Sequence, residues 1–282
     1  MSGAALGGTQ DLKGTPAFPE DPLSAAKIAE GLKTNEFARR MELHPVIDST
    51  NNRAREAAAD GVPHGYLVAA EAQTAGRGRM GRSFLSPPGS GVYLSYVLRP
   101  AVSPEKAALV TSLAAVAVAR AVESLAPAEV RIKWVNDLYL NGRKFCGILS
   151  EAGFSQRADR LEYVVLGIGV NVKPMLFPPE LREIATSLGN ETGLDLSRNL
   201  LVAEISNQLE QLYGALESGA FLEESRRRSN VIGRQVLVID GGRQYPALAT
   251  AIDNQGRLVV RTADGTVSAL GCGEVSLKRL AP

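Results

Sequence analysis

The segment that most constrains this chain is Glu71–Arg82, which reads EAQTAGRGRMGR and is called the arginine loop below. Each guanidinium offers a planar fork of donors that matches two oxygens of a phosphate or carboxylate. Glycine lets a backbone approach a ligand closely, because it has no Cβ. The segment therefore predicts a loop that wraps an anion, built from Arg77, Arg79 and Arg82 and spaced by Gly76, Gly78 and Gly81.

The same glycines match the G-x-G-x-x-G fingerprint of dinucleotide-binding folds. That fingerprint should lead from a strand into a helix and meet an acidic residue about 20 residues later. Here the following segment, Gly91–Leu98, is typical of a strand, and no acidic residue lies between Arg82 and Glu105. The sequence context therefore argues against a Rossmann site.

Composition argues against several classes of protein. The 282 residues include 31 basic and 30 acidic side chains, a balance that argues against a protein that coats nucleic acid. Two distant cysteines, Cys146 and Cys272, indicate isolated thiols in a reducing compartment. Residues 1–22 are predicted to be a disordered leader without signal-peptide character. The longest apolar run, Ala107–Ala119, is too short to span a bilayer, so we expect a buried helix and a cytoplasmic protein without membrane contact.

Hydrophobic periodicity predicts alternating strands and helices up to about residue 231. The pattern over residues 22–43 indicates one short helix and a second partial one, too little chain for a complete DNA-binding domain. Ser49 and Thr50 end a predicted strand, 46–51, and either cap the helix 52–59 or serve a site. Further elements are expected at 66–70, 91–98, 103–125, 130–135, 138–140, 144–149, 161–172 and 197–218.

Lys144 follows the hairpin signal Asn141-Gly142. Strand alternation places it on one face with Cys146 and Ile148, which is an apolar face. A lysine there is costly to desolvate unless an anion meets it, so Lys144 is a candidate site residue. The alternative is that its stem reaches water from the strand end.

The strand 161–172 carries Gly167 and Gly169 on one face, which indicates a close approach by a ligand or by another segment. Asn171 follows on that face and could read the edge of a purine. Arg226–Arg228 is expected to be a solvated helix face. From Ile232, short β-rich runs separated by turn signals predict a small antiparallel barrel.

Taken together, the motifs resemble those of biotin protein ligases, which activate biotin with ATP and attach it to a lysine of a carrier domain. The resemblance covers residues 23–280. It depends on the segments 48–51 (DSTN), 75–82 (AGRGRMGR), 133–137 (KWVND), 142–149 (GRKFCGIL) and 167–171 (GIGVN). Val135 stands where the family usually has proline, and Phe84 where it often has tryptophan.

The resemblance implies an α+β fold in which a mixed β-sheet is packed with helices, as in class II synthetases. It implies a catalytic domain at 23–231 and an SH3-like barrel at 232–282. Biotin would be held by Ser49, Thr50, Gln73, Gly76, Arg77 and Lys144. ATP and the adenylate would be held by Arg79, Arg82, Phe84, Lys133, Asn136 and Asn171. Lys144 and Arg79 would be catalytic, and Asp137 would help to hold Mg²⁺.

The implied partner is a biotin carboxyl carrier protein, such as the acetyl-CoA carboxylase subunit, with no DNA and with the enzyme a monomer or homodimer. This is the ligase-only type of the family. A lipoate ligase is the nearest alternative, and an RNA-binding module that uses the Gly-Arg loop is an alternative of another class.

Overall fold

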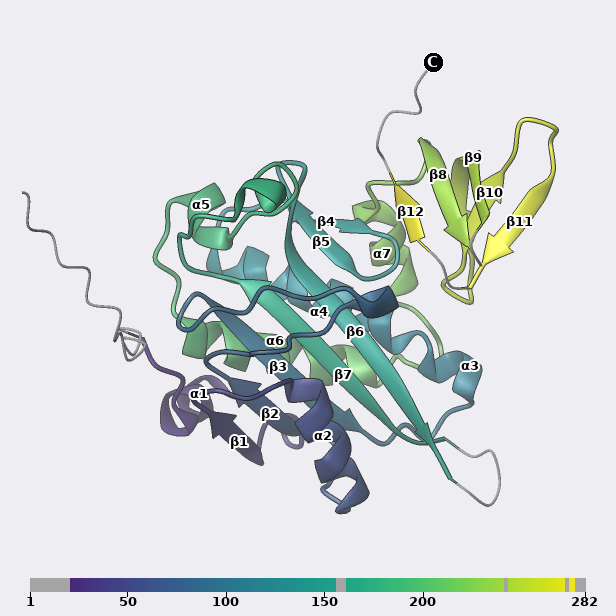
Figure 1. Ribbon diagram of the computed structural model, residues 1–282. Coiled ribbons are helices and arrows are strands. Elements are labelled where there is room, and N and C mark those ends of the chain that lie inside the picture. Colours follow the sequence, from purple (N-terminus) through teal and green to yellow (C-terminus); the bar gives the residue numbers. More distant parts are fainter. Residues whose placement is uncertain (1–20, 156–160, 241–242, 272–273, 277–282) are drawn as a thin grey trace, which may run out of the picture.

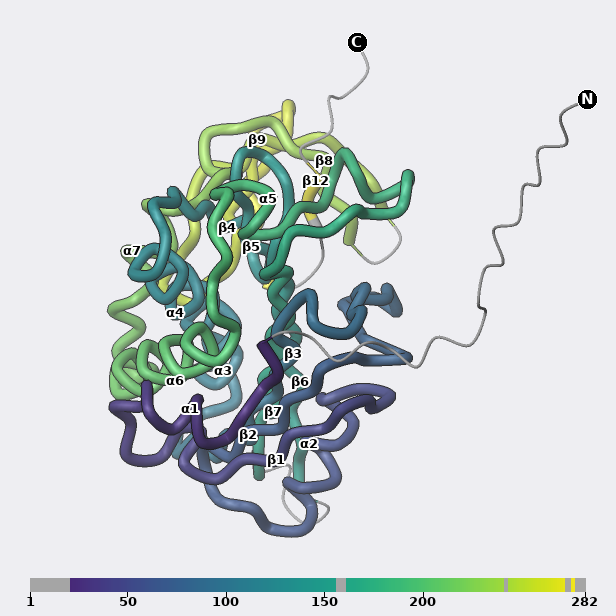
Figure 2. Tube along the Cα trace, turned by 90° about the vertical axis from the view of Figure 1, so that its left-hand side faces the viewer, coloured from purple at the N-terminus to yellow at the C-terminus, as the bar shows by residue number. Residues whose placement is uncertain are grey.

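The computed structural model describes residues 21–155, 161–240, 243–271 and 274–276, and within them the chain forms two β-sheets with helices on both sides of the larger one (Figures 1 and 2). The predicted leader at residues 1–20 and Cys272 lie outside the described residues. Asp21 and Pro22 do not belong to a disordered leader, because they accept hydrogen bonds from Arg198 and Asn199.

The larger sheet has seven strands in the spatial order β1-β2-β3-β7-β6-β5-β4. Its first pair is parallel and the other pairs are antiparallel, so the predicted mixed sheet is confirmed. The strands are β1 (Met41–His44), β2 (Tyr66–Ala70), β3 (Gly91–Leu98), β4 (Arg131–Lys133), β5 (Asp137–Leu140), β6 (Arg143–Phe154) and β7 (Leu161–Asn171).

Different helices cover the two faces of the larger sheet. The helices are α1 (Ala25–Gly31), α2 (Thr50–Ala59), α3 (Pro104–Ala107), α4 (Val110–Leu125), α5 (Leu188–Thr192), α6 (Arg198–Tyr213) and α7 (Leu222–Arg228), with 3₁₀ turns η1 (Arg79–Gly81) and η2 (Pro179–Leu181). Helices α4 and α6 pack on one face of the sheet and bury the main core, while α2 and the arginine loop lie on the other face (Figure 2).

The apolar helical stretch Pro104–Leu125 is long enough to cross a membrane by length and composition. In the fold 72% of its most apolar 18-residue window is buried, because α4 packs against β5 and β6 of the sheet and against α6 beside it. The prediction of a buried core helix is therefore confirmed.

Two predictions near the N-terminus are wrong. The segment that follows α1 is a loop and not a second helix. Its N–H groups at Asn35, Glu36 and Phe37 donate to the Glu210 carboxylate of α6, so they need no helical acceptor. The predicted strand 46–51 does not form either. The strand is β1, which ends at His44, and the chain then enters α2 at Thr50.

The second sheet has the order β11-β10-β9-β8-β12 and is antiparallel. Its strands are β8 (Gln235–Asp240), β9 (Arg243–Ile252), β10 (Leu258–Arg261), β11 (Val267–Leu270) and β12 (Glu274–Ser276). Strand β12 was not predicted, and it extends the sheet by pairing with β8. The sheet encloses a small apolar core of its own, in agreement with the predicted C-terminal barrel.

A buried arginine fixes both ends of the segment that carries the arginine loop. Arg198 on α6 is fully buried, and its Nη1 lies 2.6 Å from Glu71 Oε2 and 3.2 Å from the Gly91 carbonyl. Glu71 follows β2 directly and Gly91 begins β3. The loop is therefore held at its base and rises over the sheet.

Candidate active site

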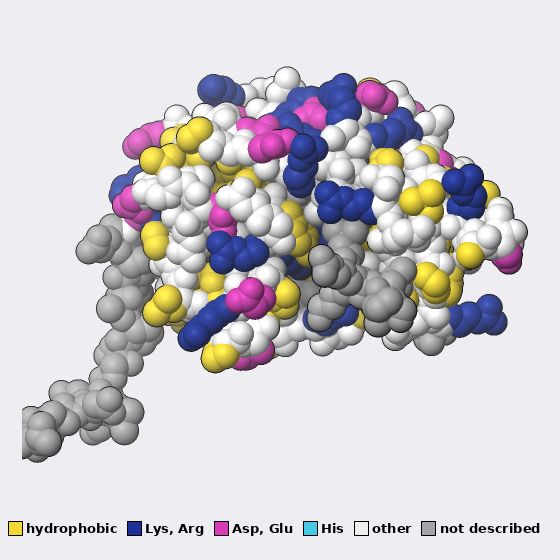
Figure 3. Space-filling model, turned by 90° about the horizontal axis from the view of Figure 1, so that it is seen from above, with side chains coloured by type: hydrophobic (Ala, Val, Ile, Leu, Met, Phe, Trp, Pro, Cys, Tyr) yellow, Lys and Arg dark blue, Asp and Glu magenta, His cyan; other side chains and the backbone are white. Residues whose placement is uncertain are grey.

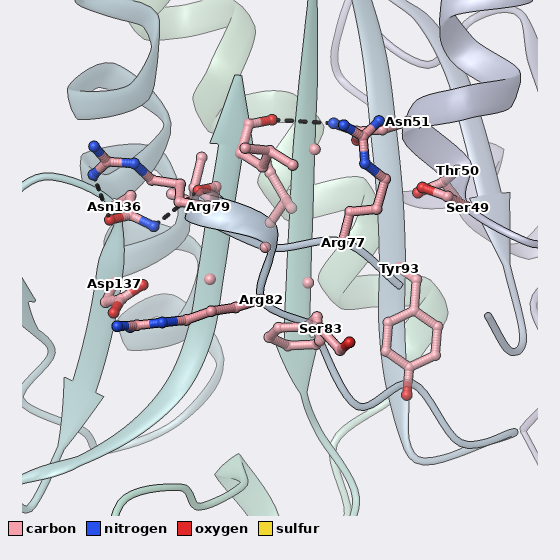
Figure 4. A pocket seen from close by; sticks show the side chains of 18 of the residues that line it. Ser49, Thr50, Asn51, Arg77, Arg79, Arg82, Ser83, Tyr93, Asn136 and Asp137 are labelled. Atoms are coloured by element: carbon pink, nitrogen blue, oxygen red, sulfur yellow. Dashed lines mark hydrogen bonds between the residues drawn. The ribbon is translucent and has the colours of Figure 1, made fainter. Parts of the chain in front are cut away.

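A cavity lies between the arginine loop and the sheet face that carries α2 (Figure 4). Strands β3, β5, β6 and β7, the start of α2 and the loop all contribute to its wall. Its lining contains most of the predicted site residues, which come from distant parts of the chain: Ser49, Thr50, Gln73, Arg77, Arg79, Arg82, Phe84, Lys133, Asn136, Asp137 and Lys144.

The arginine loop is folded back on itself. The Phe84 N–H donates to the Gly76 carbonyl at 2.9 Å, and the Gly78 N–H donates to the Arg82 carbonyl at 2.7 Å. Gly76 does not line the cavity. It permits this turn, because a Cβ on it would lie 2.4 Å from the Phe84 carbonyl oxygen.

Uncharged polar groups form one end of the cavity, called the neutral end. The Ser95 hydroxyl, fully buried on β3, donates to Asn51 Oδ1 at 2.6 Å and lies 2.8 Å from Thr50 Oγ1. Gln73 Oε1 accepts from the Thr50 N–H at 2.9 Å, and its Nε2 donates to Ser86 Oγ. Ser49 occupies the N-cap of α2 without a side-chain capping bond. The capping interpretation of Ser49 is therefore wrong.

Arg77 crosses from the loop toward this neutral end (Figure 4). Its Nη2 lies 2.7 Å from Glu151 Oε1 on β6, and its Nη1 lies 3.0 Å from Asn52 Oδ1 on α2. The guanidinium therefore joins the loop to both the sheet and α2.

The opposite end, called the charged end, lies at β5 and β6. Lys144 Nζ lies 2.7 Å from Asp137 Oδ1, and Arg79 Nη1 donates to Asn136 Oδ1 at 3.1 Å. Asn136 is oriented in turn by its Nδ2, which donates to the Ile148 carbonyl. The Arg82 side chain points toward Asp137 in Figure 4. Cationic groups from two segments, the arginine loop and β6, thus converge here.

Lys144 reaches the cavity by a route that strand alternation does not predict. A register shift between β5 and β6 leaves Phe145 and Cys146 both fully buried, so the side chains of β6 stop alternating there. A Cβ on Gly147 would lie 3.2 Å from Lys144 Nζ, which places the lysine beside Gly147. The prediction that Lys144 shares a face with Cys146 is therefore wrong, although Lys144 does line the cavity.

Glycines clear the sheet between the two ends. A Cβ on Gly167 would lie 2.1 Å from Asn51 Oδ1, and one on Gly169 would lie 2.7 Å from the Phe84 ring. The close approach predicted for Gly167 and Gly169 is confirmed. The chain's own Asn51 and Phe84 are the groups that approach.

Tyr93 supports the return of the loop segment. Its hydroxyl donates to the Pro87 carbonyl at 2.9 Å, and burial raises the pKa of the phenol to about 12. The phenol therefore stays protonated and continues to donate this hydrogen bond at alkaline pH values where an exposed tyrosine ionises.

Asn171 was predicted to contact adenine in the site, but it lies outside the cavity wall. It is buried, does not line the cavity, and donates from Nδ2 to the Thr186 carbonyl at 2.9 Å. The same segment pairs with Lys144, whose N–H donates to the Ile184 carbonyl. Asn171 thus supports a loop beside the cavity.

Comparison with known proteins agrees with this geometry. Residues 43–171 match the model of the Biotin/lipoate A/B protein ligase family, and residues 231–278 match the Biotin protein ligase C terminal domain. The Bifunctional ligase/repressor BirA of Bacillus subtilis is 37% identical over 250 residues, covering 86% of this chain and 76% of that protein. The chain belongs to the biotin protein ligase family. The Biotin--[acetyl-CoA-carboxylase] ligase of Mycobacterium tuberculosis is 32% identical over 237 residues, covering 81% of this chain and 86% of that protein.

A solved structure supports the same assignment. Biotin protein ligase from Aquifex aeolicus in complex with biotin and ATP superposes with a TM-score of 0.71 at 26% identity, covering 84% of this chain and 98% of that one.

The C-terminal domain of this ligase contacts the charged end through Trp134. Trp134 lines the cavity, packs into the core of the second sheet, and donates from Nε1 to the Gly256 carbonyl at 2.9 Å.

Arg226 on α7 donates to the Ile252 carbonyl, and Arg228 pairs with Glu123. The prediction that these arginines form a solvated face is therefore wrong for both.

The sequence indicated no role for three residues that lie in or beside the cavity. Asn51 belongs to the DSTN motif, so the motif itself could have indicated it. Trp134 lies within KWVND, but its contact with Gly256 depends on folding over a long separation. Glu151 carries no local signal, because only strand pairing and the loop bring it to Arg77.

Among the described ranges, no group of three or more His, Cys, Asp or Glu side chains could hold a metal ion. Asp137 is the one acidic side chain among the described residues that line the cavity. Mg²⁺ is usually held by one or two carboxylates together with substrate phosphates. The site therefore fits Mg²⁺ only where a phosphorylated substrate supplies most of the ligands.

Proposed function

We propose that this protein condenses biotin with ATP to form biotinyl-5′-AMP and then transfers biotin to a lysine of a carrier domain. The observation that carries the proposal is a single cavity with a neutral, hydrogen-bonding end and a cationic end, beneath an arginine loop. A carboxylic acid with an uncharged polar ring and a polyphosphate together match those two ends.

The neutral end fits the ureido ring of biotin. Ser49, Thr50 and Gln73 offer hydroxyl and amide groups that complement the urea carbonyl and its two N–H groups. Gly76 contributes through the loop turn, and Arg77 closes the wall on this side. Because Thr50 and Gln73 are already fixed by hydrogen bonds to each other and Thr50 to Ser95, little ordering of these two side chains is needed when biotin binds.

The charged end fits the reacting groups. One oxygen of the biotin carboxylate attacks the α-phosphorus, a new P–O bond forms, and the bond to the bridging oxygen breaks so that pyrophosphate leaves. Negative charge grows on the α-phosphoryl oxygens and on the leaving group. We assign Lys144 and Arg79 to the α-phosphoryl group, and Arg82 and Lys133 to the departing phosphates.

The adenine would lie against Phe84 and Asn136. The Phe84 ring already covers Gly147 and Gly169, and it would have to share this surface with the base. Asn171 is not proposed as a direct contact, because its amide is bonded to Thr186 outside the cavity lining. Asp137 is proposed as a single ligand of the Mg²⁺ that accompanies ATP, and the metal would neutralise charge on the phosphates.

In the second step the carrier lysine, as a free amine, attacks the acyl carbon. A C–N bond forms, the C–O bond to AMP breaks, and the amine loses a proton. The proposed carrier is a biotin carboxyl carrier domain, and the proposed location is the cytoplasm. The Mycobacterium tuberculosis and Paracoccus denitrificans relatives, 32% and 33% identical, are named for acetyl-CoA carboxylase as acceptor.

An incubation of the protein with biotin, ATP, Mg²⁺ and a purified carrier domain, probed with streptavidin, tests the proposal. We expect carrier labelling that requires ATP, and pyrophosphate exchange that requires biotin. Exchange driven by lipoate and not by biotin would contradict it and would favour a lipoate ligase.

A further inference from the structure

Glu151 lies on β6, two residues after Leu149. Leu149 is part of the cavity wall, whereas Glu151 is not. Its carboxylate binds Arg77 with both oxygens, at 2.7 Å (Nη2 to Oε1) and 3.2 Å (Nη1 to Oε2). Such a two-point contact fixes the plane of a guanidinium as well as its position.

The same carboxylate also reaches the neutral end. Asn51 Nδ2 donates to Glu151 Oε2 at 2.8 Å, while Asn51 Oδ1 accepts from Ser95 at 2.6 Å. Glu151 therefore connects the arginine loop to the buried hydroxyl and amide groups of the neutral end. Asn51 itself is held tightly, since Gly167 leaves room for its amide and no more.

Stability alone does not explain this arrangement. The Arg77 and Glu151 side chains are 38% and 28% exposed, and ion pairs at such positions contribute only about 0–1 kcal/mol to folding. A long arginine side chain on a surface loop otherwise samples many rotamers, and ordering it on binding lowers affinity. Holding Arg77 and Asn51 beforehand avoids that cost.

We propose that Glu151 is a positioning residue that couples the arginine loop to the biotin end of the cavity. The inference rests on the proposed function, because it assumes that the neutral end holds biotin. Glu151 would act by holding Arg77 and Asn51 in place, and it would not contact the reacting atoms. The coupling concerns biotin more than ATP, because Glu151 has no contact with the charged end among the interactions of the described residues.

The test is Glu151→Gln, which keeps the shape of the side chain but removes its charge and one acceptor oxygen. We expect the KM for biotin and the calorimetric Kd for biotin without ATP to rise roughly 10-fold or more, the scale of a charge-assisted hydrogen bond. The KM for ATP, kcat and the thermal midpoint should change little. Glu129→Gln removes an exposed acid paired with Arg131 and is the matched control, expected to behave as wild type.

A double-mutant cycle with Arg77→Gln gives the second readout. Because Glu151 holds Asn51 as well as Arg77, the two losses should be less than additive: the double variant should bind biotin at least about 2-fold more tightly than the product of the two single losses predicts. Fully additive effects would overturn the proposal.

Three results for Glu151→Gln would also overturn the proposal. The first is an unchanged Kd for biotin, and the second is a lower Kd, which would show that Glu151 holds Arg77 away from the ligand. The third is an equal loss in biotin binding, ATP binding and kcat together with a lower thermal midpoint. Failure of the proposed function is distinguishable, since the wild-type protein would then form no biotinyl-AMP.

Discussion

The two ends of the cavity solve different problems with different chemistry. At the neutral end, Ser95 and Asn51 are 0% and 4% exposed and are saturated with hydrogen bonds to other side chains. At the charged end, the Lys144 and Asp137 side chains remain 31% and 19% exposed. A buried neutral network recognises a ligand by shape and by donor and acceptor pattern, whereas partly exposed cations stabilise charge as it develops.

The two ends should therefore respond differently to mutation: the neutral end to small shifts in side-chain position, and the charged end to the loss of a positive charge. In the neutral end a small shift leaves buried groups unpaired, at a cost of about 1–3 kcal/mol for each group. In the charged end small shifts are tolerated, but loss of a cation removes stabilisation of the transition state. Variants should therefore separate into effects on biotin binding and effects on turnover.

The largest effect is expected for Lys144→Ala. Turnover in biotin-dependent pyrophosphate exchange should fall about 10²–10³-fold, the range seen when a preorganised stabilising group is removed. The thermal midpoint should change little, because the Lys144–Asp137 pair is partly exposed. Lys106→Ala, which removes a lysine bonded to the Glu217 carbonyl, is the control. A Lys144→Ala enzyme with full turnover would refute the role of the charged end.

Arg79→Gly should have the next largest effect. The variant loses the hydrogen bond to Asn136 and a cation beside the adenylate. Release of biotinyl-AMP into solution should rise about 10- to 100-fold, measured by chromatography of the filtrate. Undetectable free adenylate together with normal carrier labelling would show that Arg79 does not retain the intermediate.

Gly167→Ala tests the neutral end by shape alone. The added Cβ would lie 2.1 Å from Asn51 Oδ1, so the amide must move. We expect a loss of about 1–3 kcal/mol in the free energy of unfolding and a rise of roughly 10-fold in the Kd for biotin. Gly214→Ala, at the C-cap of α6, where the backbone angles are helical and an added Cβ would meet no heavy atom within 4 Å, should leave both quantities nearly unchanged. Wild-type biotin affinity in Gly167→Ala would contradict a rigid neutral end.

The smallest effect concerns the buried side of β6, behind the charged end. Burial raises the pKa of the Cys146 thiol, so the reactive thiolate is scarce at neutral pH. In a Cys272→Ser background, native Cys146 should not react with a disulfide reagent over an hour, and should react at once in denaturant. Rapid native reaction would show that β6 opens and that the charged end is less fixed than described.

Local patterns predicted much of this molecule. Alternation and turn signals placed β2, β3, β7 and α4, and the motifs brought the correct residues to one cavity. Pairing between distant segments was not predictable. The register shift that turns Lys144 away from Cys146, the bond of Asn171 to Thr186, and the contact of Glu151 with Arg77 depend on which strands and loops become neighbours.

A crystal structure with biotinyl-5′-AMP bound tests the account most directly. We expect the ureido ring within hydrogen-bond distance of Thr50 or Gln73, and the phosphate within ion-pair distance of Lys144 and Arg79. A ligand bound in the reverse direction, with its phosphate beside Thr50, would contradict it.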